Sequence, residues 1–406
     1  MSLPKLHRGH LFAACGFLVP TLAVYLSGML MPLLILMALL VLGLAFRRQE
    51  ERLKISWIAV AFFAVLALWG AMTALWSVAP ERSVSQALSL VGIAACGLVL
   101  LAGVRTLGPA DRRRIGMGLL TGLGVASLFM AVEIWAGFPF YTHTSSRPPT
   151  LDLFNRWTTI ATLLIWPVLL WVGQNPKPWR IAAVLIPAFL VLVQMESIAS
   201  LIALVLGAIA FFLAFHFPKR AIIALICLTM AGVVLAPILP KHLPDPRAIW
   251  AAAPSLPGSA IHRIYIWKFV AERIEERPFQ GWGLDTARNI PNKGHMIWAV
   301  GDGGESLPLH PHNAVLQWWM EIGLPGAVIG GLFIVWLFVM ILRRRMAPYP
   351  HAVFTGCLAS AVTVALFGYG IWQTWWLATL FLTAVLLLGI AEKETRQGPT
   401  PCRTLK

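Results

Sequence analysis

Two stretches in the second half of the sequence carry side chains suited to chemistry, and the first surrounds Arg263. Residues 261–277 have the apolar periodicity of a helix. At 100° per residue, Arg263 lies on the same apolar face as Trp267 and Val270. An arginine on a packed face needs an anion or a carbonyl partner, because an unpaired buried charge is costly. Guanidinium binds phosphate through parallel hydrogen bonds, so we expect an anion at Arg263; a structural ion pair or a side chain that reaches solvent are the alternatives.

The second stretch, residues 309–313, reads Leu-His-Pro-His-Asn. His312 shares a helical face with Leu316, which directs it toward the protein rather than toward water. Imidazole, with an ordinary pKa of about 6.5, is the side chain best suited to remove a proton from a hydroxyl near neutral pH. We therefore predict that His312 is a general base. A helix is predicted to begin at Pro311, because the missing N–H of proline costs nothing there.

The neighbouring histidine, His310, is the weaker candidate for a base. It precedes a proline in an extended segment and lacks the packing expected for His312, so we expect its replacement to be better tolerated. The two histidines could instead bind a metal. However, their spacing is a weak metal signal, and no Asp-x-Asp pair or clustered carboxylates accompany them. We predict neither a metal ion nor a cofactor.

Two further arginines lie in the shorter polar stretch 137–156. Arg147 follows two serines and precedes two prolines, and Arg156 comes directly before an apolar run. A solvated loop residue is the alternative for Arg147, and an arginine that extends to the membrane interface is the alternative for Arg156. The residue types and positions of these two arginines leave both a functional and a structural role open.

The composition determines what kind of element must position these side chains. Of the 406 residues, 58% are hydrophobic and only 12% are charged, and the mean hydropathy is +0.76; soluble domains have about 25% charged residues. Lipid is therefore the expected solvent. The net charge of +15 does not indicate nucleic acid, because the basic residues stand mainly in short blocks between apolar runs. The five cysteines predict neither a disulfide framework nor a zinc site.

Apolar runs of the length that crosses a bilayer recur along the whole chain. The sequence predicts an all-α polytopic membrane protein, a single integral membrane domain over residues 1–406, with about twelve spans. Short blocks of lysine and arginine alternate between the runs, which places both termini in the cytoplasm. The predicted spans are 11–27, 29–46, 55–75, 86–104, 115–136, 157–172, 181–195, 198–217, 221–239, 325–342, 352–367 and 371–390.

Two segments on the non-cytoplasmic side are too long to be simple turns. One is 137–156; the other runs from 240 to 312 between spans nine and ten and continues to 324 with its helix-like stretch. Loops of this length are usually functional, and we expect the second to be a partly helical cap packed on the membrane domain. Ionisable residues are nearly absent from the predicted spans, which argues against an ion-coupled transporter.

Three strings in this long segment resemble the bacterial O-antigen ligases and the wider superfamily of O-antigen polymerases and pilin oligosaccharyltransferases. Residues 262–267 look like the Arg-x-x-x-Trp helix of that family. Residues 277–283 look like its Pro-x-x-Gly-x-Gly turn, and residues 312–323 look like its His-Asn-x-x-Leu helix followed by Glu-x-Gly. Detailed resemblance covers about residues 262–326, and the topology is similar across the rest.

The resemblance implies an inverting, metal-independent glycosyl transfer in the periplasm of a bacterial inner membrane, on an architecture like that of the GT-C glycosyltransferases. The donor is a glycan on undecaprenyl pyrophosphate, and the acceptor is a hydroxyl of the lipid A-core oligosaccharide. His312 is implied as the catalytic base, and Arg263 as a pyrophosphate ligand. Arg147 and Arg156 are implied as further ligands, and the supporting residues are Asn313 and Trp267.

Other activities remain open from the sequence. An O-antigen polymerase uses the same donor with a growing lipid-linked glycan as the acceptor, and the motifs do not separate the two cleanly, although the His-Asn helix favours a ligase. A protein O-oligosaccharyltransferase commonly carries an extra carboxy-terminal region. From a different class, a flippase or transporter of lipid-linked oligosaccharides should have a polar central cavity, for which the spans offer few polar residues.

Overall fold

The computed structural model describes residues 7–48, 53–144, 148–173, 177–195, 197–256, 258–291, 296–297, 304–305 and 309–391. Each of the twelve predicted spans falls on a helix, because a chain in lipid must satisfy its backbone hydrogen bonds internally. The long helices are α1 (Arg8–Ala23), α2 (Leu30–Arg48), α3 (Trp57–Met72), α4 (Pro80–Val104), α5 (Pro109–Trp135), α7 (Asn155–Val172), α8 (Pro178–Gln194), α9 (Ile198–His216), α10 (Pro218–Leu235), α14 (Ala314–Arg343), α15 (Pro348–Phe367) and α16 (Thr374–Ile390).

The prediction of an all-α multi-pass membrane protein is confirmed. Within the described residues, nine helical segments are long and apolar enough to cross a membrane. Helices α8 and α16 are also apolar but shorter, at 17 residues each, and α1 has 16 residues. That α1, α8 and α16 also cross the membrane, which would give twelve spans, therefore stays a prediction. Five of the long helices, α4, α5, α8, α10 and α15, begin at a proline, which suits the first helical turn.

Close packing of small residues holds the bundle together. Helix α1 lies along α5, where a Cβ on Gly118 would come within 2.2 Å of the Ala13 carbonyl oxygen. Helix α9 lies against α15. At this contact the fully buried indole of Trp166, which belongs to α7, donates to Ser360 Oγ of α15 at 3.0 Å. Small residues and buried hydrogen bonds of this kind drive helix association in lipid, where hydrophobicity alone gives no preference for protein neighbours.

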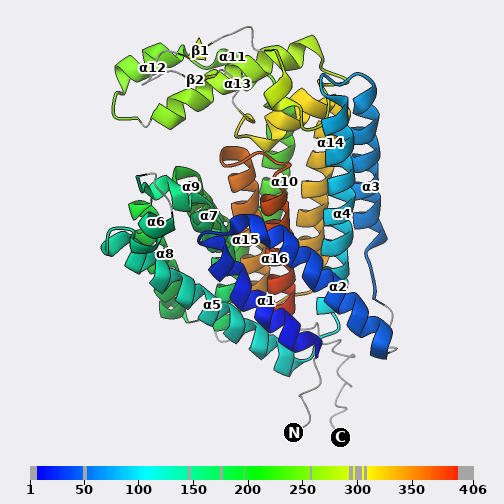
Figure 1. Ribbon diagram of the computed structural model, residues 1–406, viewed down its shortest axis with the longest axis vertical. Coiled ribbons are helices and arrows are strands. Elements are labelled where there is room, and N and C mark those ends of the chain that lie inside the picture. The colour runs from blue at the N-terminus through cyan, green and yellow to red at the C-terminus, as the bar shows by residue number, and fades with distance from the viewer. Residues whose placement is uncertain are drawn as a thin grey trace, which may run out of the picture.

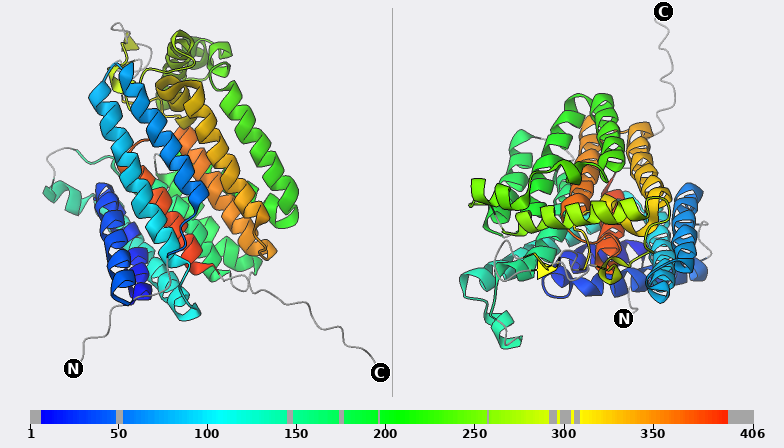
Figure 2. Two further views of the ribbon diagram at one scale, coloured as in Figure 1. Left: turned by 90° about the vertical axis from the view of Figure 1, so that its right-hand side faces the viewer. Right: turned by 90° about the horizontal axis from the view of Figure 1, so that it is seen from above.

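Shorter elements complete the chain at the end of the bundle that carries the candidate site. Figure 1 shows the cap elements gathered over one end of the long helices, and both views of Figure 2 show the cap covering that end. The cap consists of α11 (Leu239–His242), α12 (Pro246–Ala252), α13 (Gly258–Glu276), η4 (Ala287–Asn289) and the antiparallel pair β1 (Met296–Ile297) and β2 (Gly304–Glu305). The remaining elements are η1 (Ser27–Met29), η2 (Thr73–Leu75), α6 (Pro139–Thr144) and η3 (Leu151–Phe154).

Helix α14 is broken at Gly323, and a turn of the cap fills the break. Gly323 has φ +64° and ψ −165°, so the segment before it and the membrane span after it are two helices joined by a kink. The turn 278–284 lies against this kink, and two of its glycines also have positive φ angles: Gly281 at +68° and Gly283 at +114°. A Cβ on Gly323 would lie 2.2 Å from the Phe279 carbonyl oxygen, so only glycine permits this approach.

The same turn is also held by the tops of α3 and α4. The indole of Trp76 donates to the Gln280 carbonyl at 3.1 Å. Arg82 of α4 forms an ion pair with Asp285 at 2.8 Å, and Thr73 Oγ1 accepts from the Leu284 amide at 3.0 Å. The described part of the long segment therefore packs on the tops of α3 and α4.

The proposed orientation of this bundle can be measured by thiol labelling. Gln280 is exposed on the cap turn, whereas Lys219 is exposed at the start of α10, the opposite end of a helix that leads into the cap. In a chain whose five native cysteines are replaced, we expect Gln280→Cys to react with a membrane-impermeant reagent in intact cells. Lys219→Cys should react only after the membrane is opened, because lysine-rich ends face the cytoplasm. Equal labelling of both in intact cells would contradict the orientation.

Candidate active site

His312 lies immediately before α14 in a left-handed backbone conformation, with φ +54°. The helix begins at Ala314 rather than at Pro311, so the predicted helix start was wrong. Asn313 is the reason: its side-chain oxygen accepts from the amides of Val315 and Leu316, both at 3.0 Å, and thereby caps the helix. The supporting residue Asn313 thus fixes the helix end that carries the histidine.

The ring of His312 is held by one strong hydrogen bond. Its Nδ1 lies 2.7 Å from the carbonyl oxygen of Gly368, in the connection between α15 and α16. Because a carbonyl oxygen only accepts, Nδ1 must carry the proton of the neutral ring, which leaves the lone pair on Nε2. Nε2 is therefore the atom of His312 that can remove a proton.

His310 is packed more tightly than the sequence suggested. Its side chain is only 7% exposed, its ring centroid lies 4.3 Å from that of His312, and its Nδ1 accepts from the His312 amide at 3.3 Å. Burial, together with the charges of His312, Arg288 and Arg263, lowers the pKa of His310 to about 3. The expectation that His310 lacks support was wrong, and this neutral ring stabilises the left-handed turn at His312.

Arg263 and Trp267 bring the cap helix α13 to the histidines. The Trp267 indole donates to the Pro311 carbonyl at 2.9 Å, and its ring lies 6.1 Å from Phe367. Arg263, one turn earlier, has a buried Nε with no hydrogen-bond partner among the described residues. Burial lowers the pKa of this guanidinium, although the nearby Tyr369 opposes the shift. A buried guanidinium N–H without a partner is free to donate to an anion, because such a group is costly to leave unpaired.

The electrostatics keep His312 neutral. Burial of the ring lowers its pKa, the Gly368 carbonyl raises it, and the charges of Arg263 and His262 lower it further. The net direction is downward from the ordinary value of about 6.5. A histidine in this state is unprotonated at neutral pH and ready to act as a base.

Arg156 approaches the same region from α7. Its Nη1 lies 3.5 Å from Ser27 Oγ, and its guanidinium carbon lies 5.3 Å from the ring centroid of Trp375. Tyr369 packs edge-on against Trp375 at 4.7 Å and interacts electrostatically with both Arg156 and Arg263. The structure thus links these two predicted residues through one tyrosine; Arg147 lies outside the described residues.

Sequence reasoning missed Gly368 and Tyr369. The only local signal is an aromatic residue between two glycines, Gly368 and Gly370, where a long apolar run breaks. Within the described part of the chain, no group of three or more histidine, cysteine or acidic side chains could hold a metal ion.

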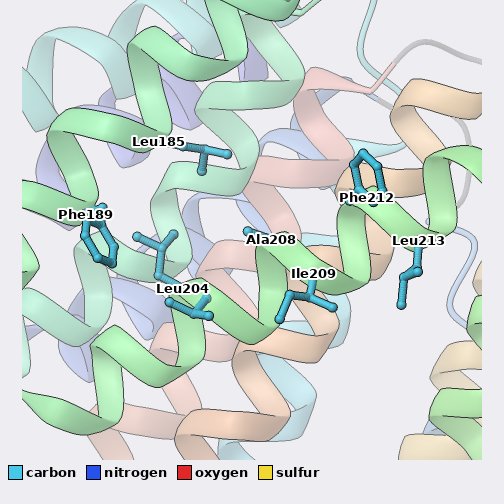
Figure 3. A pocket seen from close by; sticks show the side chains of 8 residues that line it. Leu185, Phe189, Leu204, Ala208, Ile209, Phe212 and Leu213 are labelled. Carbon is cyan, nitrogen blue, oxygen red and sulfur yellow. The ribbon is translucent and has the colours of Figure 1, made fainter.

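A groove on the outer face of the bundle is apolar. It has a volume of about 410 Å³ between α8 and α9 and is lined only by hydrocarbon side chains, several of which Figure 3 shows. Its lining contains no acid, base or phosphate ligand. The residues that line it are Leu185, Phe189, Leu204, Val205, Ala208, Ile209, Phe212 and Leu213.

Residues 182–331 match the O-antigen ligase family. The predicted resemblance to the O-antigen ligase family is thereby confirmed. The matched region runs from α8 into the membrane segment of α14, and so contains Arg263, Trp267, His312 and Asn313, but not Arg147 or Arg156.

Several rickettsial proteins, each named as a candidate polysaccharide ligase, are similar to this chain. The protein of Rickettsia felis is 24% identical over 401 residues, which cover 93% of this chain and 97% of the relative. That of Rickettsia conorii is 26% identical over 279 residues, covering 68% and 67%, and that of Rickettsia typhi is 28% identical over 271 residues, covering 66% of each. No solved structure matches the chain.

If His312 is the base of a transfer reaction, its lowered pKa predicts how activity depends on pH. The ring acts as a base only when neutral, so activity should be full near pH 7 and should fall with acid only below about pH 6.5. The measurement is initial rate against pH with saturating substrates, and a single-proton slope is expected. An acid limb centred above pH 6.5 would mean that another group titrates.

Proposed function

We propose that this protein transfers a glycan from undecaprenyl pyrophosphate to a hydroxyl of the lipid A-core oligosaccharide. One observation carries the proposal: the unpaired buried Nε of Arg263 lies in the same site as the neutral base His312. Such a site can hold a phosphate and accept a proton at once. The O-antigen ligase match supports this class of reaction.

In the proposed reaction the protein supplies an anion clamp and a base. Arg263 binds the pyrophosphate of the donor, and Nε2 of His312 takes the proton of the acceptor hydroxyl. The deprotonated oxygen attacks the anomeric carbon as the bond from that carbon to the pyrophosphate oxygen breaks. Arg263 stabilises the negative charge that develops on the departing pyrophosphate. This is a single displacement, which inverts the configuration at the anomeric carbon; a double displacement would need a carboxylate nucleophile.

The remaining predicted residues have secondary roles in this proposal. Arg156, and with it Arg147, adds positive charge toward the pyrophosphate. Trp267 holds the Pro311 carbonyl, and Asn313 holds the start of α14, so both fix the base relative to the clamp. Because guanidinium can neutralise a pyrophosphate leaving group, we further propose that the transfer needs no divalent metal.

The proposed location follows from the topology of the bundle. The chain is a multi-pass membrane protein, and we propose that it lies in a bacterial inner membrane with both termini in the cytoplasm. The cap and its site would then face the periplasm. Only this side gives a sugar hydroxyl of the acceptor access to the arginine and histidine at the cap end of the bundle.

The test of the function is reconstitution of the purified protein in lipid nanodiscs with a chosen acceptor. With undecaprenyl-pyrophosphate-linked glycan as the donor, we expect transfer to lipid A-core and release of the lipid pyrophosphate, with or without a chelator. An anomer-specific glycosidase or NMR analysis should show inversion. Transfer only to a second lipid-linked glycan would identify a polymerase instead, and activity restored by magnesium after chelation would contradict the metal-independent step.

Arg263→Lys should lose most of the activity even though it keeps the positive charge. An ammonium is a point donor and cannot reproduce the fork of a guanidinium, so the loss in kcat should be on the order of 10² to 10³-fold. Arg247→Lys is the matched control, because Arg247 is an exposed arginine on the cap helix α12. A lysine variant at Arg263 with near-normal rates would leave this arginine a purely structural role. Arg156→Ala should be equally or less impaired.

His312→Ala should abolish transfer while the protein remains folded and inserted. Removing a general base typically costs about 10² to 10⁴-fold in rate, and the donor should still bind because Arg263 is unchanged. His242→Ala on the exposed helix α11 serves as the control. The measurements are turnover, donor binding and thermal stability in detergent. Ordinary turnover, or a loss that follows only from lost stability, would refute the assignment.

A further inference from the structure

Glu321 is a fully buried carboxylate in the segment of α14 that precedes the kink. Its Oε1 accepts from the Ala287 amide at 3.1 Å and from the side-chain amide of Gln317 at 3.0 Å. Its Oε2 accepts from the Asp285 amide at 2.8 Å and from the indole of Trp372 at 2.5 Å. Four N–H groups therefore converge on one side chain, two on each oxygen.

Such a set of partners demands a group that only accepts hydrogen bonds. Burial and the charge of Asp285 raise the pKa of this carboxyl to about 8, and the hydrogen bonds from Gln317, Trp372 and the Asp285 amide oppose the shift. Only the ionised form, which offers two oxygens with about four lone-pair sites, accepts from all four donors. The amide of a glutamine has the same shape, but its NH₂ group would face two N–H groups and leave them unpaired. Buried donors without partners cost about 1–3 kcal/mol each, so Glu321→Gln is not a conservative change in this place.

The network of Glu321 extends to the segment that holds the His312 ring. Gln317 donates to Glu321 with its nitrogen and accepts from the Ile371 amide with its oxygen, at 3.0 Å. Trp372 is bound directly to Glu321. Residues 371 and 372 are thus fixed to α14, only three or four residues after Gly368, whose carbonyl holds Nδ1 of His312.

The other half of the network is the cap. The amides of Asp285 and Ala287 belong to the turn that follows the 278–284 segment, and they bind the same carboxylate. One side chain therefore joins the cap turn to the connection between α15 and α16. Within the described residues, the hydrogen bonds of the Glu321 side chain go to these two segments and to Gln317, and not to the histidines or Arg263.

We propose that Glu321 is a positioning residue for the reaction, which fixes residues 371–372 to α14 so that the Gly368 carbonyl orients the His312 ring. The inference rests on the proposed function, because it assigns an effect on the base of that reaction. Glu321 acts through His312 and not on the substrate, so its loss should reduce turnover without weakening donor binding.

The test is Glu321→Gln in the full-length protein in nanodiscs, with Glu272→Gln as the matched control at an exposed glutamate of α13. We expect kcat to fall about 10²-fold, donor Kd to change less than twofold, and the acid limb of the rate profile to move to lower pH. The limb moves down because the Gly368 carbonyl is the contact that raises the pKa of His312, and the variant loses it. A purely structural role predicts a different result, since a loosened fold admits water and moves the limb upward or leaves it in place.

Trp372→Phe keeps the proposal testable if the glutamine variant does not fold. Phenylalanine keeps most of the buried ring and removes only the indole N–H that Glu321 accepts. We expect a smaller loss of kcat, about 3 to 10-fold, with the acid limb shifted in the same direction. Wild-type rates for both variants, or an upward shift, would refute the positioning role. If the native protein and Glu272→Gln also fail to transfer glycan, the proposed function is at fault instead.

Discussion

The break in α14 at Gly323 is the constraint on which the site depends. A broken helix leaves carbonyl and amide groups without partners, and in lipid or in a protein core each unpaired group costs several kcal/mol. The cap supplies three of the missing partners, and the indole of Trp69 in α3 supplies the fourth. The Met320 carbonyl accepts from the Trp282 amide at 2.9 Å, the Glu321 carbonyl from the Gly283 amide at 2.7 Å, the Ile322 carbonyl from the Trp69 indole at 2.8 Å, and the Leu324 amide donates to the Pro278 carbonyl at 2.9 Å.

This pairing places both halves of the site at once. The turn that fills the break is tied to the end of α13, since the Trp282 indole donates to the Arg273 carbonyl at 2.9 Å and Arg277 lies 4.1 Å over the Trp282 ring. Helix α13 carries Arg263, and His312 lies two residues before the first residue of α14, next to the short segment that precedes the break. Two side chains almost fifty residues apart in the sequence therefore reach one site, because a single turn docks on a single kink.

The sequence predicted the helices and the side chains, but not the contacts between them. The apolar face of α13 was predicted correctly, since Val270 and Ile274 are buried while Glu272 and Glu275 are exposed. Periodicity predicts which face of a helix a residue lies on, and composition predicts whether the protein lies in lipid or in water. Neither predicts which distant residue a side chain contacts. The partner of the His312 ring, in the connection after α15, was therefore missed.

Two errors in the sequence reasoning have the same physical origin. The helix was expected to begin at Pro311 because proline suits a first turn, but the side chain of Asn313 competes more effectively by accepting two amides. His310 was expected to be poorly supported because it precedes a proline, yet Gly370 leaves space for its ring: a Cβ there would lie 2.9 Å from the imidazole. Three of the four donors around Glu321 also come from distant segments.

The left-handed backbone at His312 has a consequence for how such a protein evolves. A side chain in this conformation costs about 1 kcal/mol relative to glycine, although histidine tolerates it better than most residues. The residue that this backbone conformation prefers and the residue that carries the imidazole are therefore different. The ring offsets part of the backbone cost through its hydrogen bond to the Gly368 carbonyl. Where an imidazole is needed at this position, backbone preference and selection for the side chain act in opposite directions.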